Sequence, residues 1–541
     1  MIDTFVTQRF RLHWLSAGGL ALMLAACGGD DNAGATSASA PGDAAGATVQ
    51  QAQLEAGSAE YNGAPDAVNE KAGPVLTRSL AQGEGDRPTP RVIVLPELTA
   101  AEAPPQAQDE PGKSLQIGVG RDIPQTADAK AMAGLLSWST AANGSRRAAI
   151  SVRSPGAAAL RFGLLVEQLP QQAVLRVYAP GAEQAREVAG KEVLNTIQSN
   201  LDAGDSGVQQ AHTYWLPSVE GDQTVLEIEL PAGVGPASLK VSLPRVSHRY
   251  TSESILRKMW FGEGKAGSCN VNVMCNSNAK NDSTRRAIGW MTFVADDAAT
   301  HGCSGTLLNT TEDNDSPKKE WKPYFLSANH CIPNQSVANT VEVTWDYRTV
   351  SCNDSSLSPV FNGQFEHLGR DKDGRLVVGQ LKVAQGGAEL KYTSKNTDTS
   401  FMLLNSKLPA GLLFAGWNAR AQPSTRFDVH SFHQPKGDTE KYSAGTIISY
   451  MSCQFSWCKQ FSLPKNHLSG IGYPFYEVIW GKGVTEPGSS GGPLFSSNSK
   501  QVIGQLWGGF SSCSNPNGSD KFGRFDIAYK EGNLAKWLDP Q

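Results

Sequence analysis

The sequence predicts an all-β protein with two folded regions. Short apolar or alternating runs, separated by Pro and Gly turns, recur from about residue 115 onward. A length of 541 residues exceeds one ordinary domain. All cysteines except Cys27 lie beyond residue 268, so a disulfide framework is expected in the second region only. We therefore predict a β-sandwich over residues 113–250 and a β-barrel domain over residues 264–541.

Residues 1–27 have the pattern of an export signal. Arg9 and Arg11 precede the apolar run Leu15–Ala26, which is too short to span a bilayer. With Cys27 and Gly28, the segment resembles a bacterial lipobox, in which the signal is cut before the cysteine and the new terminus is acylated. This implies a membrane anchor at Cys27 and an exported protein, either an outer-membrane lipoprotein or extracellular after processing. A plain secretory signal is the alternative.

Residues 28–112 differ in composition from the rest of the chain. They are rich in Ala, Gly, Pro, Asp, Glu and Gln and poor in large apolar side chains, so we predict a flexible tether. Residues 113–250 then show strand patterns at Ala148–Arg153, Ala173–Tyr178 and Thr224–Leu230. No catalytic or phosphate-binding motif occurs there. We interpret this region as a pro-region or binding module.

Residues 264–541 carry many β-type runs. They include Ala287–Val294, Thr340–Tyr347, Ser400–Leu404, Glu477–Trp480 and Val502–Trp507. Strands this numerous, separated by turn residues and combined with cysteines, indicate a β-barrel domain.

Charge and ligand patterns exclude several functions. The formal net charge of -4, without a basic stripe, argues against a nucleic-acid partner. The nine histidines form no HExxH or similar cluster, and no CxxC pair occurs. We therefore expect no metal and no organic cofactor.

A glycine-rich turn surrounds the candidate nucleophile, Ser490. The segment Glu486–Leu494 reads Glu-Pro-Gly-Ser-Ser-Gly-Gly-Pro-Leu. A nucleophilic serine needs a tight turn that exposes its hydroxyl, and glycines let backbone N–H groups converge on the oxyanion formed during attack. Gly488 and Ser490 would donate those N–H groups. Taken alone, the segment could also be an ordinary flexible turn.

A histidine upstream could act as the base for this serine. His330 ends the run Tyr324–His330 and precedes Cys331, with Cys303 further upstream. A bridge between these cysteines would hold the loop of His330 and fix its imidazole as a general base. We interpret His330 and Ser490 as base and nucleophile.

Together, these motifs resemble the trypsin-like serine proteases, and most closely bacterial lysyl endopeptidase. The resemblance runs from about Gly264 to Pro540. It rests on these segments: Ser268–Asn270 with Cys275, Tyr324–Cys331, Ala415–Trp417, Gly483–Pro493, and Gly504–Leu506 with Ser511–Cys513. It implies a double β-barrel, protein or peptide substrates, and a zymogen whose cleft is uncovered when the N-terminal region is removed.

The family also has an aspartate at the head of an apolar strand between the histidine and the serine. Asp398, followed by Thr-Ser-Phe-Met-Leu-Leu, fits that position. A register that aligns the two leucines would place Ser400 there instead. We favour Asp398, because a carboxylate can fix the imidazole tautomer and stabilise the imidazolium.

The same resemblance implies three disulfides. They are Cys269–Cys513, Cys275–Cys352 and Cys303–Cys331. Cys453 and Cys458 are left over and close in sequence, so a small local loop is their simplest pairing. The sequence alone does not fix this connectivity.

Substrate preference is predicted from an acidic residue after Cys513. Animal trypsins place their specificity carboxylate six residues before the nucleophile, a position held here by Val484. The lysyl endopeptidase resemblance instead implies that Asp520 pairs with a substrate lysine. Trp507 stands where the relatives have a histidine, which would reshape the pocket. Glu486 is a second acidic candidate.

The sequence thus predicts a serine endopeptidase that acts through an acyl-enzyme, with cleavage after Lys. The alternative is a catalytically silent protease-fold lipoprotein that serves as a surface binding protein. Ser489 stands where animal trypsins carry an Asp that captures the new amino terminus, so activation by that salt bridge is not expected. Lys265, just before Cys269, is the expected processing site.

Overall fold

The structure, a computed structural model, describes most of the chain beyond residue 51. The described residues are 52–63, 75–80, 87–99, 102, 111–205, 208–250, 266–314, 316, 319–349, 351–352, 369–370, 376–377, 383–422, 426–454, 457–460 and 473–540. Those from Ala52 onward belong to one structural unit. Cys27 and Lys265 lie outside the described residues. Among the residues described, no helix has the length and apolarity needed to cross a membrane.

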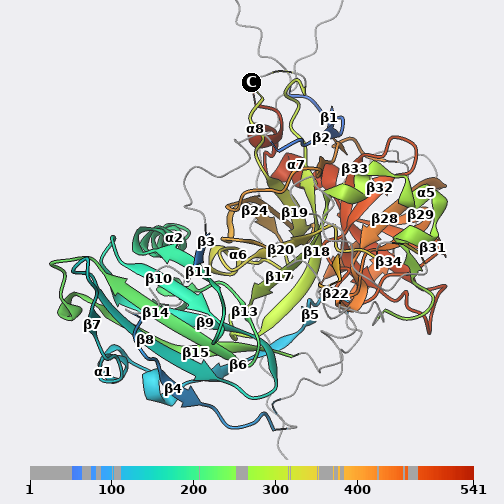
Figure 1. Cartoon of the computed structure of the whole chain (residues 1–541). Coiled ribbons are helices and arrows are strands. Elements are labelled where there is room, and N and C mark those ends of the chain that lie inside the picture. Colours follow the sequence, from blue (N-terminus) through green and yellow to red (C-terminus); the bar gives the residue numbers. More distant parts are fainter. Residues whose placement is uncertain are drawn as a thin grey trace, which may run out of the picture. The chain divides into compact units, whose positions relative to one another are not determined.

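The N-terminal region contains two sheets around one apolar core (Figure 1). The first sheet has the order β3 (Leu76–Ser79), β11 (Gln184–Ala189), β10 (Val174–Tyr178), β14 (Gln223–Leu230), β8 (Arg146–Arg153) and β4 (Arg91–Val94), with β7 (Ser139–Thr140) beside β8. The second has the order β12 (Thr213–Trp215), β9 (Ala157–Gln168), β15 (Lys240–Tyr250) and β6 (Gly118–Asp122), with β13 (Val219–Glu220) beside β9.

The two central strands of this region explain its core. Leu226 and Ile228 of β14 alternate along the strand and are fully buried, as are Leu160 and Phe162 of β9. Side chains two residues apart share one face of a strand, so both sheets direct an apolar face into the same core. The predicted β-sandwich is confirmed.

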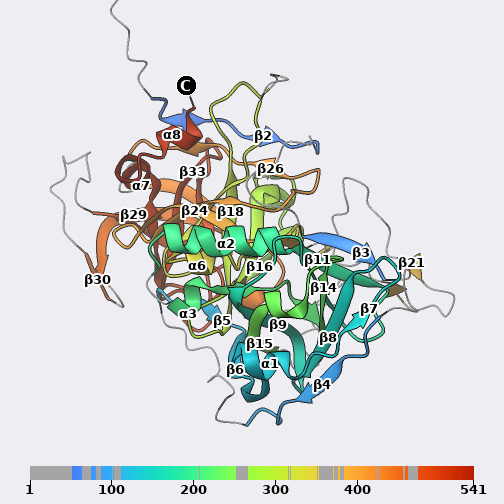
Figure 2. The ribbon, with the colours of Figure 1, turned by 90° about the vertical axis from the view of Figure 1, so that its left-hand side faces the viewer.

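Short helices complete both regions. The amphipathic helix α2 (Gly190–Asp202) packs against β11 and β12 (Figure 2). The other α-helices are α1 (Ala129–Ala133), α3 (Val208–Ala211), α5 (Ser277–Lys280), α6 (Gln335–Ala338), α7 (Phe525–Glu531) and α8 (Ala535–Leu538).

Part of the predicted tether carries strands. Besides β3 and β4, the described residues of segment 28–112 include β1 (Glu55–Ala56) and β2 (Ala59–Glu60), which pair with β27 (Trp417–Asn418) and β26 (Leu413–Phe414). The tether prediction is therefore wrong for these pieces. Composition measures whether a segment can build its own core. The strands β1, β3 and β4 instead add backbone hydrogen bonds at the edges of larger sheets, and β2 forms a two-stranded sheet with β26.

The first sheet of the C-terminal region has eight strands. Its order is β23 (Val383–Gln385), β20 (Glu342–Trp345), β17 (Ile288–Val294), β18 (Thr300–Leu308), β19 (Tyr324–Ala328), β25 (Thr399–Leu404) and β24 (Ala388–Ser394), and β5 (Leu115–Gln116) pairs with β18. Its central strands are buried along their length. The described residues leave this sheet open between β23 and β24.

The second sheet of this region closes into a six-stranded barrel. The ring runs β33 (Val502–Gly509), β32 (Pro493–Ser496), β28 (Phe427–His433), β29 (Lys441–Gln454), β31 (Phe475–Lys482) and β34 (Ser519–Arg524), and β34 pairs back to β33. Beside the ring lie β16 (Val271–Asn272) and β30 (Trp457–Gln460), and β21 (Gly369–Arg370) pairs with β22 (Leu376–Val377). The all-β prediction is confirmed, and a closed barrel is present.

Three disulfides join segments far apart in sequence. They are Cys269–Cys513, Cys275–Cys352 and Cys303–Cys331, the three pairings that the family resemblance implies. Cys453 of β29 lies opposite Cys458 of β30 in the strand register. Their side chains are outside the described part of the structure, so this fourth pairing stays a prediction.

Candidate active site

His330 and Asp398 lie in direct contact. His330 Nδ1 is 2.8 Å from Asp398 Oδ2, and the backbone N–H of His330 donates to Asp398 Oδ1 at 2.9 Å. Both side chains are largely buried. A carboxylate next to Nδ1 makes that nitrogen the protonated one, which leaves Nε2 as the basic nitrogen of the neutral ring.

Two paired strands bring these residues together. Ala328, the last residue of β19, lies opposite Thr399, the first residue of β25. Asp398 has a φ of +50°, a left-handed conformation that is uncommon outside glycine and clusters at functional sites. Gln505 Nε2 donates to the carbonyl groups of Thr397 and Asp398 at 2.8 and 3.2 Å. The turn that carries the carboxylate is therefore held from the second barrel.

The other ring nitrogen of His330 faces no protein partner. Across the described residues, His330 Nε2 is buried and accepts or donates no hydrogen bond. A buried polar atom without a partner is costly, and such atoms are found at catalytic positions. A neutral imidazole in this state can accept a proton at Nε2.

The turn around Ser490 packs against the end of β19. Ser490 is buried, and its carbonyl accepts a hydrogen bond from Ser304 N–H at 2.8 Å. Gly491 has a φ of +77° and lies so close to Ser327 that a Cβ would not fit. Gly488 has a φ of +95°, which also favours glycine. Gly491 lets the turn approach the strand that leads to the histidine loop, and Gly488 lets it approach Gln434 and Lys436.

Ser400, the alternative third member, is oriented elsewhere. Its Oγ donates to the carbonyl of Ile332 at 2.6 Å and lies 3.0 Å from Thr393 Oγ1. Asp398, by contrast, makes two hydrogen bonds to His330. The geometry favours the register with Asp398.

A buried histidine, His433, contacts the turn that carries Ser489 and Ser490. His433 Nδ1 is 2.8 Å from Ser489 Oγ, and its Nε2 is 3.0 Å from Ser443 Oγ. Ser443 donates to the carbonyl of Val484 at 2.9 Å, so Nε2 carries the proton and Nδ1 accepts from Ser489. Burial lowers the pKa of His433 to about 3, which keeps the ring neutral. Ser489 thus contacts a neutral side chain where animal trypsins have an ion pair.

Asp520 is a fully buried carboxylate held by neutral groups. Its Oδ2 accepts from Trp480 Nε1, Thr485 Oγ1 and Ser511 Oγ at 2.6, 2.7 and 2.5 Å, and Oδ1 accepts from Ser511 N–H at 3.2 Å. Burial raises the pKa of Asp520, and the hydrogen bonds oppose that rise. In the described structure, no Lys or Arg side chain forms an ion pair with it.

A pocket connects Ser490 to the groups around Asp520. Ser490, Thr485 and Ser511 line it together with Gly508 and Gly509. Asp520 lies one hydrogen bond behind this wall, because Thr485 and Ser511 both donate to its carboxylate. The pocket therefore offers hydroxyl groups backed by a negative charge, which suits a cation.

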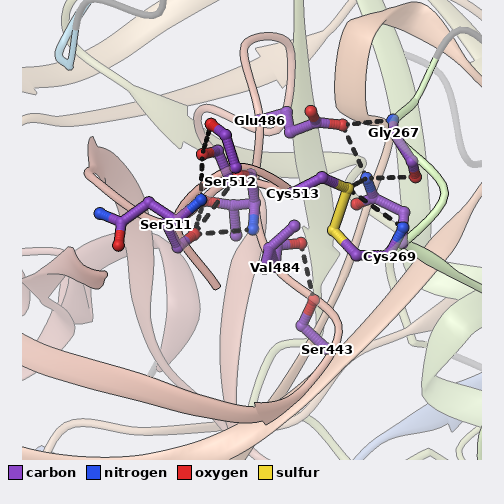
Figure 3. Close-up of a disulfide and its surroundings, with 12 residues drawn as sticks. Gly267, Cys269, Ser443, Val484, Glu486, Ser511, Ser512 and Cys513 are labelled. Carbon is purple, nitrogen blue, oxygen red and sulfur yellow. Dashed lines mark hydrogen bonds between the residues drawn. A yellow bond between two sulfur atoms is a disulfide. The ribbon is translucent and has the colours of Figure 1, made fainter. Parts of the chain in front are cut away.

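Glu486, the second acidic candidate, already has partners from its own chain. Its carboxylate accepts from Gly267 N–H at 2.8 Å and from the Asn270 side chain at 2.6 Å, and it pairs with Lys436 at 2.9 Å. Figure 3 shows Glu486 and Gly267 beside the disulfide that includes Cys269. Glu486 fixes the start of the protease region and is less suited to binding a substrate cation.

Trp507 packs in an apolar cluster beside the pocket. Its ring lies 6.2 Å from that of Phe475 in an edge-on arrangement, and Met451 completes the cluster. Trp507 is not among the described residues that line the pocket, although its neighbours Leu506 and Gly508 are. Trp507 therefore packs next to the residues that line the pocket.

One group of side chains has the spacing of a metal site. One ligand atom each of Cys303, His330 and Cys331 lies within 4.8 Å of the others. The two sulfurs form a disulfide, however, and a metal ligand must be a thiolate. The disulfide instead fixes the loop next to His330.

Two family models match the chain in its sequence. The model described as the lysyl endopeptidase C-terminal domain matches residues 263–523, and the model of the lysyl endopeptidase N-terminal domain matches residues 94–250. The chain belongs to the lysyl endopeptidase family. Together the two models cover both folded regions, so the N-terminal region is part of the family pattern.

The chain is also similar to known proteases. The chain is 28% identical to the lysyl endopeptidase of Pseudomonas aeruginosa over 463 residues, which cover 82% of this chain and 86% of the relative. Solved structures with similarity include the Rv3671c protease of M. tuberculosis in its active form, with 15% identity, a TM-score of 0.28, and coverage of 50% of this chain and 89% of that one. The HtrA-type protease AlgW with a tripeptide has 14% identity, a TM-score of 0.27, and coverage of 47% and 62%.

The protein is a serine protease, and its substrates are proteins or peptides. Of the residues predicted from the sequence, the structure brings His330 and Asp398 into contact, and it places Ser490 on the pocket whose wall covers Asp520. Three further residues support these groups and were not predicted. These are Gln505, which holds the Asp398 turn, and His433 and Ser443, which hold the Ser489 turn. His433 and Ser443 lie outside the segments that carry the family resemblance. Gln505 lies in one of them, but its role depends on a contact between distant strands.

Proposed function

We propose that this lysyl endopeptidase family member is an endopeptidase that cleaves after lysine through an acyl-enzyme on Ser490. His330 takes the proton of Ser490 Oγ and returns it to the leaving amine, while Asp398 orients His330 and stabilises its protonated form. The backbone N–H groups of Gly488 and Ser490 stabilise the oxyanion. The lysine side chain enters the pocket, where its ammonium pairs with Asp520.

The observation that carries this proposal is the connection from Ser490 to a buried, unpaired carboxylate. A buried carboxylate held only by neutral donors is costly when charged. The ammonium group of a substrate lysine would supply the missing counter-charge. The long unbranched side chain of lysine suits this pocket, because Asp520 lies behind the residues that line it. The name of the Pseudomonas aeruginosa relative agrees with lysine as the preferred residue.

Labelling with a fluorophosphonate tests the nucleophile. The active protein should take up one equivalent of the probe, and peptide mapping should locate it on Ser490. Ser499→Ala is a matched control, because Ser499 is an exposed serine in the loop that follows β32. Ser499→Ala should label as the wild type does, and Ser490→Ala should not label. A wild-type protein that takes up no probe would support the silent binding protein instead.

Mapping of cleavage sites tests specificity separately. A peptide library digested by the active protein should yield products that end in lysine. Equal cleavage after lysine and arginine would retain the protease and remove the lysyl preference. Cleavage without any basic residue would remove Asp520 from the proposed role as well.

We also propose that the protein is exported and anchored through lipid on Cys27. The lipobox-like end of the first 27 residues supports this, together with an even set of cysteines confined to the protease region. Cells fed a palmitate analogue should label the wild-type protein and not Cys27→Ser. Equal labelling of both proteins would refute the anchor at Cys27.

Processing at the region boundary completes the proposal. The backbone N–H of Ala266 lies 3.3 Å from the Asp438 carboxylate. A cut after Lys265 would turn that N–H into an ammonium group beside a carboxylate, which would favour the cut form. Amino-terminal sequencing of the active released domain should give Ala-Gly-Ser-Cys. A start far from Ala266 would refute processing at this site.

A further inference from the structure

The N-terminal region sends one strand into the protease cleft. In β5, Leu115 pairs with Gly302 of β18 and Gln116 pairs with His301, and just after β5 the Ile117 N–H donates to the carbonyl of Thr300 at 2.8 Å. The chain then continues directly into β6 of the sandwich. The strand is thus held at one end by the protease sheet and at the other by the N-terminal region.

Leu115 anchors this strand on one side of the nucleophile. A Cβ placed on Gly488, two residues before Ser490, would lie 3.2 Å from Leu115 Cδ2. The Leu115 side chain is buried in a cluster with Trp290 and Tyr347. This contact places the strand next to the turn whose N–H groups are assigned to the oxyanion.

Gly112 anchors the segment on the other side. It has a φ of +73°, and a Cβ there would lie 2.7 Å from Trp507 Nε1. A Cβ on Gly508 would in turn lie 2.8 Å from the backbone nitrogen of Gly112. The segment therefore lies along β33, and both Gly112 and Lys113 line the pocket that Ser490 lines.

Two residues remain between the anchors. Lys113 and Ser114 connect Gly112, which contacts Gly508, to Leu115, which contacts Gly488. Lys113 lines the pocket that Ser490 lines, so the segment passes the nucleophile. Ser114 Oγ is 2.9 Å from His301 Nδ1 on β18, which fixes the second of the two. Extended peptides bind to sheet edges in this way, by adding a strand.

We propose that the Lys113–Ser114 peptide bond is a cleavage site for the protein's own Ser490, and that segment 111–116 excludes other substrates until this bond is cut. The proposal rests on the proposed lysyl function, because the lysine preference selects this bond from the three that cross the nucleophile. Lys113 lines the pocket that Ser490 lines, and it is exposed in the uncut chain.

The reaction balances with water as the only co-reactant. Ser490 Oγ bonds to the carbonyl carbon of Lys113, the bond from that carbon to Ser114 N breaks, and the hydroxyl proton passes through His330 to the leaving amine. Water then hydrolyses the ester and restores Ser490. The products are a Lys113 carboxylate and a new Ser114 amino terminus, with residues 114–250 still joined to the protease region.

The test uses the full-length protein and three variants, followed by intact mass, amino-terminal sequencing and hydrolysis of a lysyl peptide. The wild type should yield the new terminus Ser-Leu-Gln at a rate that is unchanged when the protein is diluted about 100-fold, because the bond lies in its own cleft. In Lys113→Gln the peptide bond between residues 113 and 114 should stay uncut, and the lag before peptide hydrolysis should be about tenfold longer. Ser490→Ala should stay uncut.

Lys130→Gln is the matched control, since Lys130 is an exposed lysine on α1, and it should behave as the wild type. The proposal is overturned if active wild-type protein lacks the Ser114 terminus, if the cut slows on dilution, or if a folded Lys113→Gln shows the wild-type lag. The first two measurements need no variant to fold. In each of these cases external lysyl peptides are still cleaved, so the proposed function stands. A wild type that cleaves no peptide and takes up no fluorophosphonate refutes both.

Discussion

Asp398 and Asp520 are both buried carboxylates near the cleft, yet their surroundings differ. Asp398 binds a base within the protein, since both its oxygens accept hydrogen bonds from His330. Asp520 binds only neutral donors, Trp480, Thr485 and Ser511. Burial raises the pKa of Asp520 despite these donors. The first carboxylate has an imidazole as its partner within the protein, and under the proposed function the second receives its cation from the substrate.

Under the proposed function, this difference corresponds to a catalytic role for Asp398 and a specificity role for Asp520. Losing the Asp398 carboxylate should slow every substrate, because the orientation of His330 does not depend on what is bound. Losing the Asp520 carboxylate should affect only substrates that carry a cation. Variants at the two positions therefore test whether the comparison holds.

The largest effect is expected from Asp398→Asn. The amide would favour the wrong tautomer of His330, so kcat should fall by about 10^4-fold for lysyl and leucyl substrates alike. Ser400→Ala is the matched control, because Ser400 lies on the same strand with its hydroxyl turned to Ile332. Steady-state kinetics on both variants should show a mild effect for Ser400→Ala. The opposite ranking would mean that Ser400 holds the third position.

The sequence predicts Asp398 and Asp520 but not how each is held. Both follow from family motifs in order along the chain, and Asp398 begins an apolar strand that local pattern alone predicts. Gln505, by contrast, reaches Asp398 from β33 of the closed barrel, which is a different sheet. Such a contact depends on the packing of two sheets, which no local spacing encodes. The left-handed φ of Asp398 is likewise a product of that packing.

A smaller and selective effect is expected from Asp520→Asn. Removing one partner of a buried ion pair costs about 3–5 kcal/mol, or about 10^2- to 4 × 10^3-fold. The loss should appear in kcat/KM for lysyl substrates, with leucyl substrates nearly unchanged. Paired lysyl, arginyl and leucyl substrates measure it. If the variant keeps the full preference for lysine over leucine, Asp520 is not the specificity residue.

The turn that carries Ser489 and Ser490 provides the next test. Ser489→Ala removes the hydrogen bond to His433 Nδ1 and leaves a buried nitrogen without a partner. The free energy of unfolding should fall by about 1–3 kcal/mol. Urea unfolding of the variant in the Ser490→Ala background measures this without autolysis. Ser499→Ala, on the exposed loop, should change stability by less than about 0.5 kcal/mol. Equal effects would show that His433 does not support the turn.

The fold itself shows where sequence patterns succeed and fail. The runs Ala148–Arg153, Thr224–Leu230 and Val502–Trp507 all lie in observed strands, because alternating or continuous apolar residues mark buried sheet positions. The strand β3 of segment 28–112 was missed for the opposite reason. In β3 all four residues are exposed, so the strand is held by its pairing with β11, and no apolar pattern could reveal it.

The smallest effect concerns the pH dependence of stability at Asp520. Its folded pKa is raised above the ordinary value of 3.8, chiefly by burial. A carboxyl with a raised folded pKa stabilises the fold most below its unfolded pKa, and that contribution is lost as the pH rises through the folded pKa. Asp520→Asn does not titrate. The stability of the wild type relative to the variant should therefore fall as the pH rises from about 3 to about 7.

Urea unfolding of both proteins across that pH range, again in the Ser490→Ala background, measures the difference directly. Taking the difference cancels the other titrating groups, including the buried His433, because both proteins share them. A relative stability that rises with pH would mean that the donors from Trp480, Thr485 and Ser511 outweigh burial. Asp520 would then be satisfied within the protein, as Asp398 is, and a substrate cation would gain little from it.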